Sequence, residues 1–117
     1  MTKPLTIYGI KACDTMKKAR AWLDAAGLAY AFHDYKVAGI DPDVLQGWVA
    51  RVGVDTLVNR AGTTFRKLSD AEKADLTPER AIDLMRTHPT LIKRPVLVGD
   101  GVFLVGFKPD AYAAAFR

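Results

Sequence analysis

The N-terminal stretch up to residue 34 constrains the fold more than any other part of the chain. Residues 4–9 are apolar and rich in β-formers, which is typical of a buried strand. Residues 14–26 have a helical pattern, and Gly27 follows as a helix-terminating glycine. Residues 28–34 alternate in the period of a strand. Strand, helix and strand within about thirty residues predict a βαβ unit with parallel strands. The inward face of this helix is predicted to carry Met16, Ala19, Leu23 and Ala26.

The only cysteine, Cys13, lies where the first strand gives way to the helix. The first turn of a helix presents unpaired N–H groups and about half a positive charge, which favour a thiolate over a thiol. Lys11, Lys17 and Lys18 add positive charge nearby, whereas Asp14 opposes them, so we expect a lowered pKa for Cys13. A single cysteine cannot form an internal disulfide. Disulfide chemistry would therefore need a thiol from another molecule.

The middle of the chain predicts a series of helices. Asp41-Pro42 and Thr77-Pro78 are helix-start signals, in which a capping residue precedes a proline at the first helical position. Ser69 with Glu72 fits a capping box, which predicts a short helix between these two. Residues 59–64 are typical of a loop.

The C-terminal part predicts a hairpin and a last helix. Residues 96–99 and 102–105 are rich in β-formers, and Asp100-Gly101 between them suits a type I′ turn. Pro109 then opens a helix. Its packing face is predicted to consist of Tyr112, Ala115 and Phe116.

The order of these elements is a βαβ unit, helices, a β-hairpin and a helix. That order is typical of a thioredoxin-like α/β domain with a helical insertion and a mixed four-stranded sheet. We expect a single domain over residues 1–117, with the insertion at about 41–89, because a chain of this length holds one core.

Composition excludes several classes of function. Half of the 117 residues are apolar and 26% are charged, as in ordinary globular proteins. No apolar run approaches the roughly 18 residues of a membrane span, and no signal peptide is recognisable, so we expect a soluble cytoplasmic protein without membrane contact. The net charge of +4 is modest and no basic block is interleaved with aromatics, which argues against nucleic-acid binding. His33 and His88 lie far apart in the sequence, so we expect no metal site and no bound cofactor.

Four segments occur here in an order that is specific to one family. They are residues 5–8 followed by Cys13, residues 17–23, residues 59–63, and residues 91–98. Together they resemble the arsenate reductase (ArsC) family, and within it the small YffB-like branch, with Spx-type regulators as near relatives. The resemblance runs from about residue 4 to the C-terminus and implies a thioredoxin-like fold with a helical insertion.

The resemblance also implies roles for individual residues. Cys13 corresponds to the nucleophile of the family, and Arg60 and Arg94 correspond to arginines that bind and polarise an anionic substrate. Pro95 corresponds to a proline that is often cis beside the cysteine, and Lys108 supplies a basic group before a proline. The guanidinium fork suits a carboxylate or an oxyanion. The substrate-binding set is therefore predicted to be Arg60, Arg94, Lys108, Lys11 and Pro95.

Two positions depart from the patterns of the family. Asp14 follows the cysteine directly, and its carboxylate is expected to repel arsenate. Met16 occupies the place of the second cysteine of the Cys-x-x-Cys switch in Spx-type regulators, so an internal disulfide switch is excluded.

Three functions follow from this sequence. The first is a thiol-dependent reductase with glutathione as co-substrate, acting directly or through a glutaredoxin on arsenate, another oxyanion or a disulfide. The second is a non-catalytic Spx-like regulator that binds RNA polymerase. The third is a domain that kept the fold and lost the activity.

Overall fold

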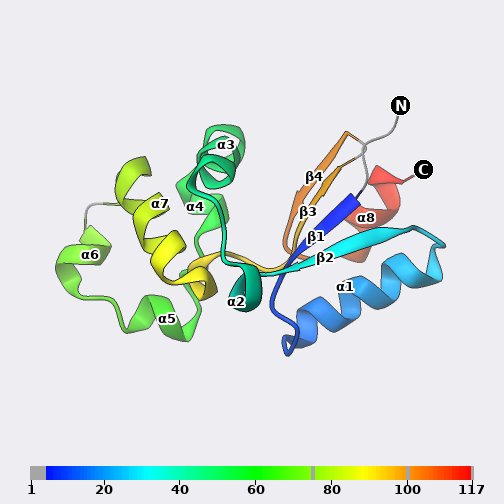
Figure 1. Cartoon of the computed structure of the whole chain (residues 1–117), viewed down its shortest axis with the longest axis horizontal. Helices are drawn as coiled ribbons and strands as arrows, with labels where there is room; N and C mark the ends of the chain where they lie inside the picture. Colours follow the sequence, from blue (N-terminus) through cyan, green and yellow to red (C-terminus); the bar gives the residue numbers. More distant parts are fainter. Residues whose placement is uncertain (1–4, 75, 100, 117) are drawn as a thin grey trace. The chain divides into compact units, whose positions relative to one another are not determined.

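The computed structural model describes residues 5–74, 76–99 and 101–116 (Figure 1). The chain divides into two compact units. The first joins the segment up to Asp34 with the segment from Arg94 onward, and we call it the sheet unit. The second is Tyr35–Lys93, the helical unit. Two predictions, residue 4 in the first strand and residue 100 in the hairpin turn, lie outside the described residues.

The sheet unit contains one four-stranded sheet in the order β2-β1-β3-β4. Strand β1 (Leu5–Gly9) is parallel to β2 (Tyr30–Asp34). Strand β3 (Val96–Gly99) is antiparallel to β1, and β4 (Val102–Val105) is antiparallel to β3. The predicted βαβ unit and the mixed four-stranded sheet of a thioredoxin-like fold are confirmed.

The β3–β4 hairpin has the predicted bounds. Gly99 pairs with Val102, which leaves a two-residue loop. Gly101 in that loop has a φ of +75°, a conformation that glycine adopts without steric cost.

Helix α1 (Asp14–Ala25) connects the two parallel strands and ends in a Schellman motif. Gly27, with a φ of +73°, donates its N–H to the Asp24 carbonyl at 3.1 Å, and Leu28 donates to the Leu23 carbonyl at 3.1 Å. The predicted glycine stop is confirmed. Ala26 is the C-cap and is exposed, so its predicted place on the inward face is wrong.

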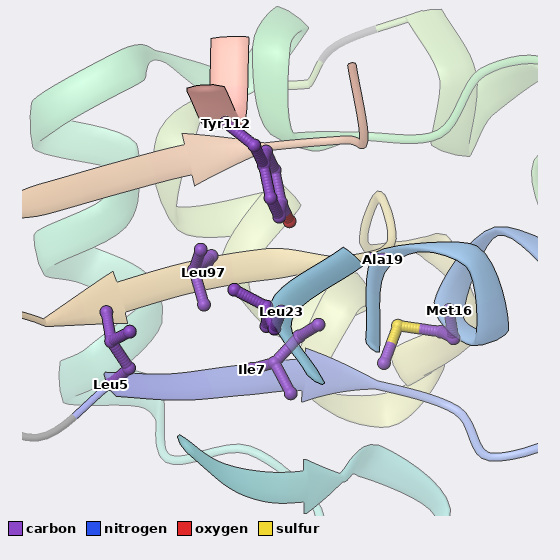
Figure 2. Close-up of a cluster of buried hydrophobic side chains, with 7 residues drawn as sticks. All are labelled: Leu5, Ile7, Met16, Ala19, Leu23, Leu97 and Tyr112. Carbon is purple, nitrogen blue, oxygen red and sulfur yellow. The ribbon is translucent and has the colours of Figure 1, made fainter. Parts of the chain in front are cut away.

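The core of the sheet unit lies between the sheet and the two helices α1 and α8 (Pro109–Ala115), which cover the same face (Figure 1). Figure 2 shows its buried side chains, which come from β1, α1, β3 and α8: Leu5, Ile7, Met16, Ala19, Leu23, Leu97 and Tyr112. Phe116 is half-buried beside the Trp22 ring, with 6.0 Å between the ring centroids, whereas Ala115 is exposed. The predicted packing face of α8 is therefore right for Tyr112 and Phe116 and wrong for Ala115.

The helical unit consists of short helices joined by turns. Its elements are α2 (Tyr35–Ala38), α3 (Pro42–Val52), α4 (Val54–Leu57), α5 (Thr63–Arg66), α6 (Asp70–Ala74), α7 (Pro78–Thr87) and the 3₁₀ turn η1 (Pro89–Leu91). Leu45, Trp48, Leu57, Met85 and Leu91 are among its buried side chains. Among the described helices of the whole chain, none is long and apolar enough to cross a membrane.

The three predicted helix starts are confirmed by their caps. Asp41 Oδ1 accepts the N–H of Asp43 at 2.8 Å, and Thr77 Oγ1 accepts the N–H of Arg80 at 3.4 Å. Ser69 and Glu72 form the reciprocal capping box, with bonds of 2.8 and 3.1 Å.

The predicted loop at residues 59–64 is only partly correct. Residues 59–62 are non-helical, but Thr63 and Thr64 open α5. Helices of four residues carry too little periodicity to be recognised from sequence, because one turn shows no repeat of an apolar face.

Candidate functional site

Cys13 lies between β1 and α1 and is the N-cap residue of that helix. Its backbone is extended, with φ −85° and ψ 129°, and its N–H donates to the Ile10 carbonyl at 3.3 Å. Its own carbonyl accepts the N–H of Lys17 at 3.1 Å, the first hydrogen bond of the helix. The side chain is half-buried. The thiol therefore sits where the sequence predicts, at the positive end of a twelve-residue helix.

The surroundings of Cys13 lower its pKa. Partial burial of the thiol acts in the opposite direction and is the largest single influence. It is outweighed by the combined effect of the Met16 backbone N–H, a hydrogen bond from the Arg94 side chain, the Thr15 backbone N–H and the positive charge of Arg94. The thiol closes no cap hydrogen bond of strict geometry. The amides of the first turn and the Arg94 side chain thus favour the thiolate, and the direction of the shift agrees with the predicted lowering of the Cys13 pKa.

Arg94 is the predicted site residue that the structure brings to the thiol. It precedes β3 and is joined to Pro95 by a cis peptide bond, as the resemblance implies. Pro95 is buried, and its carbonyl accepts the N–H of Gly106 at 2.8 Å. This bond ties the start of β3 to the segment after β4. Arg94 therefore extends from a backbone that is anchored on the sheet.

Met16 packs directly beneath the site, against the backbone of Gly9. A Cβ atom built on Gly9 would lie 2.7 Å from the Met16 Cε and closer still to its Sδ. Met16 is completely buried. The thioether thus fills the space that a side chain at position 9 would occupy, and the two residues are matched in size.

The two predicted lysines lie in the sheet unit but at its surface. Lys11 is exposed in the turn between β1 and Cys13. Lys108 is exposed as the N-cap residue of α8. Their roles in substrate binding stay predictions.

Arg60 lies in the helical unit, in the turn between α4 and α5. Its Nη2 is 2.5 Å from Asp55 Oδ1, and its guanidinium carbon lies 5.4 Å from the centroid of the Phe65 ring. Sequence reasoning missed both partners. An aspartate five residues before an arginine becomes its neighbour only because a turn of helix and a loop lie between them.

Tyr8 and His33 pack against each other in the sheet. The rings of Tyr8 and His33 lie on paired positions of β1 and β2, with 4.8 Å between their centroids. Burial raises the pKa of Tyr8, so it is a poorer acid than an exposed tyrosine. No group of three metal-ligating side chains occurs within 5–74, 76–99 and 101–116.

The thioredoxin-like sheet unit thus presents one thiol with a lowered pKa at the start of α1, with the Arg94 side chain beside it. The sequence pattern of the ArsC family matches residues 8–115, and the chain belongs to this family. The predicted resemblance to this family is therefore confirmed.

Three relatives place the chain within the family. The solved structure of the YffB protein is 62% identical, covers 97% of this chain and 99% of its own, and superposes with a TM-score of 0.92. An arsenate reductase related protein from Brucella melitensis is 50% identical, with coverage of 97% and 95% and a TM-score of 0.76. The global transcriptional regulator Spx of Streptococcus mutans is 24% identical over 94% of this chain and 81% of its own. The chain is thus similar both to reductase-related proteins and to a regulator.

Proposed function

We propose that the protein is a glutathione-dependent thiol reductase in which Cys13 is the nucleophile. The observation that carries this proposal is the Cys13 thiol at the N-terminus of α1, whose pKa is lowered by the first-turn amides and by the neighbouring Arg94 side chain. A half-buried thiol with a lowered pKa is ionised at a lower pH than a free cysteine, and the thiolate is the attacking species.

The reaction needs no second cysteine in the chain. The Cys13 thiolate attacks the glutathione sulfur of a disulfide between glutathione and a second thiol, forms a Cys13–glutathione mixed disulfide and releases the second thiol as a thiolate. The thiolate of one glutathione then attacks the glutathione sulfur of a mixed disulfide, which releases Cys13 and yields oxidised glutathione. With an oxyanion such as arsenate, Cys13 would bond to the central atom with loss of water, and two glutathione thiols would supply the two electrons.

The arginines would serve the anionic groups of the substrate. Arg94 stabilises the Cys13 thiolate and, once the sulfur is bonded covalently, its guanidinium can bind a carboxylate or an oxyanion. Arg60, which lies in the helical unit, is proposed as a second anion-binding residue. Lys11, Lys108 and Pro95 complete the proposed set, and glutaredoxin is the proposed protein partner for release of Cys13.

The test is the pH dependence of Cys13 alkylation by iodoacetamide. Because the chain has one cysteine, all alkylation reports on Cys13. We expect a midpoint below the free-thiol value of about 8.5 and a higher midpoint in Arg94→Ala. Arg20→Ala is the matched control, since Arg20 lies over the Phe32 ring at 4.7 Å in the same unit and should leave the midpoint unchanged.

Two results would contradict the proposal. A midpoint at the free-thiol value that does not respond to Arg94→Ala would exclude the activated thiolate. The second assay follows glutathione-dependent reduction of a small mixed disulfide. If the wild-type protein is no faster than Cys13→Ser in this assay, the reductase function is excluded.

The second candidate function is regulation through RNA polymerase, and the similarity to the Spx regulator favours it. Under this alternative the surface of the domain binds a polymerase subunit and the thiol is dispensable. Capture of a purified polymerase subunit by both the wild-type protein and Cys13→Ser would support this function over catalysis. Failure of both proteins to bind the subunit would exclude it.

A further inference from the structure

Arg60 is held in a defined turn of the helical unit. Its N–H donates to the Val58 carbonyl at 3.1 Å, and the N–H of Gly62 donates to the Asn59 carbonyl at 3.3 Å. A Cβ atom at Gly62 would lie 2.7 Å from the Asn59 Nδ2, so a side chain there would have to displace the Asn59 amide. The backbone therefore presents the Arg60 side chain from a fixed position within this unit.

Two neighbours contact the guanidinium of Arg60 in different ways. Asp55 Oδ1 lies 2.5 Å from Nη2 and forms an ion pair with it. The Phe65 ring lies under the guanidinium at 5.4 Å, and Lys73 Nζ approaches the same ring at 5.6 Å. The ring supports the planar cation by a cation–π contact, while the carboxylate neutralises it.

The ion pair between Asp55 and Arg60 is accessible to solvent. The side chain of Arg60 is 46% exposed and that of Asp55 is 88% exposed. Exposed pairs of this kind contribute little to stability, because water screens the charges and two side chains lose freedom. A carboxylate so weakly held can be replaced by another anion at the same guanidinium.

From this geometry we propose that the Asp55 carboxylate occupies the anion-binding position at the Arg60 guanidinium in the free protein. It is displaced when an anionic ligand binds there. The inference rests on the proposed function, in which Arg60 binds an oxyanion group of the substrate, and it assigns to Asp55 the control of that affinity. The ligand chemistry is a carboxylate or a tetrahedral oxyanion, the groups that match a guanidinium fork.

The exchange is favoured by the neighbours that stay in place. Phe65 keeps its contact with the guanidinium plane when the carboxylate leaves, so Arg60 need not lose its orientation. Lys73 keeps a second positive charge at the same ring. Asp55 is thus a positioning residue that acts through Arg60, and its presence lowers the affinity for a competing anion.

The experiment measures anion binding at Arg60 itself. The Nε–H resonance of Arg60, assigned by its loss in Arg60→Ala, is followed in ¹⁵N-labelled protein during titration with S-methylglutathione, whose carboxylates cannot undergo thiol chemistry. A parallel titration with sodium sulfate distinguishes a tetrahedral oxyanion from a carboxylate. We expect Asp55→Asn to bind the preferred anion about two- to fivefold more tightly than the wild type, the range set by the strength of an exposed ion pair.

Asp83→Asn is the matched control. Asp83 also lies in the helical unit, is 77% exposed and pairs with Arg86 at 3.6 Å, so its loss changes the net charge equally and breaks a similar ion pair. We expect no change in affinity for this variant. In the reductase assay Asp55→Asn should lower KM with kcat unchanged, whereas an effect on folding alone would alter the thermal midpoint.

Equal affinities in Asp55→Asn and the wild type, equal gains in Asp55→Asn and Asp83→Asn, or no response of the Arg60 resonance to either anion would each overturn the exchange. These outcomes are independent of the thiol. An Arg60 resonance that responds as expected beside a Cys13 with free-thiol reactivity would support the exchange and overturn the reductase.

Discussion

Different kinds of contact stabilise the sheet unit and the helical unit, each considered by itself. In the sheet unit, side chains from distant parts of the chain meet, such as Leu5, Leu97 and Tyr112 in one cluster. In the helical unit, short helices begin at local caps such as Asp41 and Ser69. The Cys13 thiol is thus placed on a framework fixed by long-range packing. Arg60 is placed on a turn between two four-residue helices, where a change of partner disturbs little.

The largest expected effect is the loss of stability when a buried side chain is truncated in the core of either unit. Leu23→Ala in the sheet unit and Met85→Ala in the helical unit each remove a completely buried side chain and should cost about 2–5 kcal/mol of unfolding free energy. Amide hydrogen exchange should show the greater loss of protection in the unit that carries the substitution. Val37→Ala is the control, because Val37 is 85% exposed and its truncation should change stability by less than about 0.5 kcal/mol. Equal loss of protection throughout the chain from either core variant would contradict two distinct units.

Glycine substitutions should act in opposite directions in the two units. Gly9→Ala places a methyl group against the buried Met16 and should destabilise by about 1–3 kcal/mol, the usual cost of overpacking. Gly47→Ala lies inside α3 with no atom within 4 Å of the new Cβ, so it should stabilise by about 1 kcal/mol through helix propensity. Chemical denaturation gives both values.

A double-mutant cycle tests the cause of the Gly9 effect. If the methyl group clashes with the thioether, Gly9→Ala should cost less in a Met16→Ala background than in the wild type. Additive effects of the two substitutions would show that the clash is not the cause.

A smaller effect concerns a buried hydroxyl in the sheet unit. The Tyr112 side chain is completely buried, and its hydroxyl has no hydrogen-bond partner among the described residues. Burial raises the pKa of Tyr112 to about 12. Tyr112→Phe should therefore stabilise by about 1 kcal/mol, since it removes a polar group left without a partner. Tyr30→Phe is the control, because the Tyr30 hydroxyl accepts a bond from Arg20 Nε at 3.4 Å and its loss should bring no gain in thermal stability.

The smallest expected effect is the pH dependence of stability that Cys13 confers. The pKa of Cys13 is lower in the folded state than in the unfolded chain, so its ionisation favours folding. The contribution is fully present above the unfolded pKa and is lost as the pH falls through the folded pKa. Urea midpoints of the wild type should therefore rise relative to those of Cys13→Ser as the pH increases through this interval. The thiol is partly exposed, so the gain should be small, and an opposite slope would contradict the lowered pKa.

Most of the sheet unit could be predicted from sequence because its signals are local and strong. The alternation in residues 28–34, the Gly27 stop and the hairpin dipeptide each fix one element, and the βαβ order fixes how two strands pair. Ala115 shows where helical spacing fails to predict burial. It follows the helical spacing of α8, but the helix is near its end there and leaves the side chain exposed.

The helical unit and the partners of Arg60 were harder to predict. Its three four-residue helices, α2, α4 and α5, depend on packing rather than on periodicity, so their sequences carry no clear pattern. The ion pair with Asp55 and the contact with Phe65 follow from the turn between α4 and α5, which no local signal specifies. The position of Cys13 at a strand-to-helix junction predicts the direction of its pKa shift, whereas its pairing with Arg94 was expected only from the family resemblance.

The packing of Met16 on Gly9 limits how this domain can change during evolution. A cysteine at position 16 would be smaller than methionine and would leave a void over the Gly9 backbone. A larger residue at position 9 would fill that void but clashes while Met16 is present. A dithiol version of this domain is therefore separated from it by two substitutions that are each unfavourable alone.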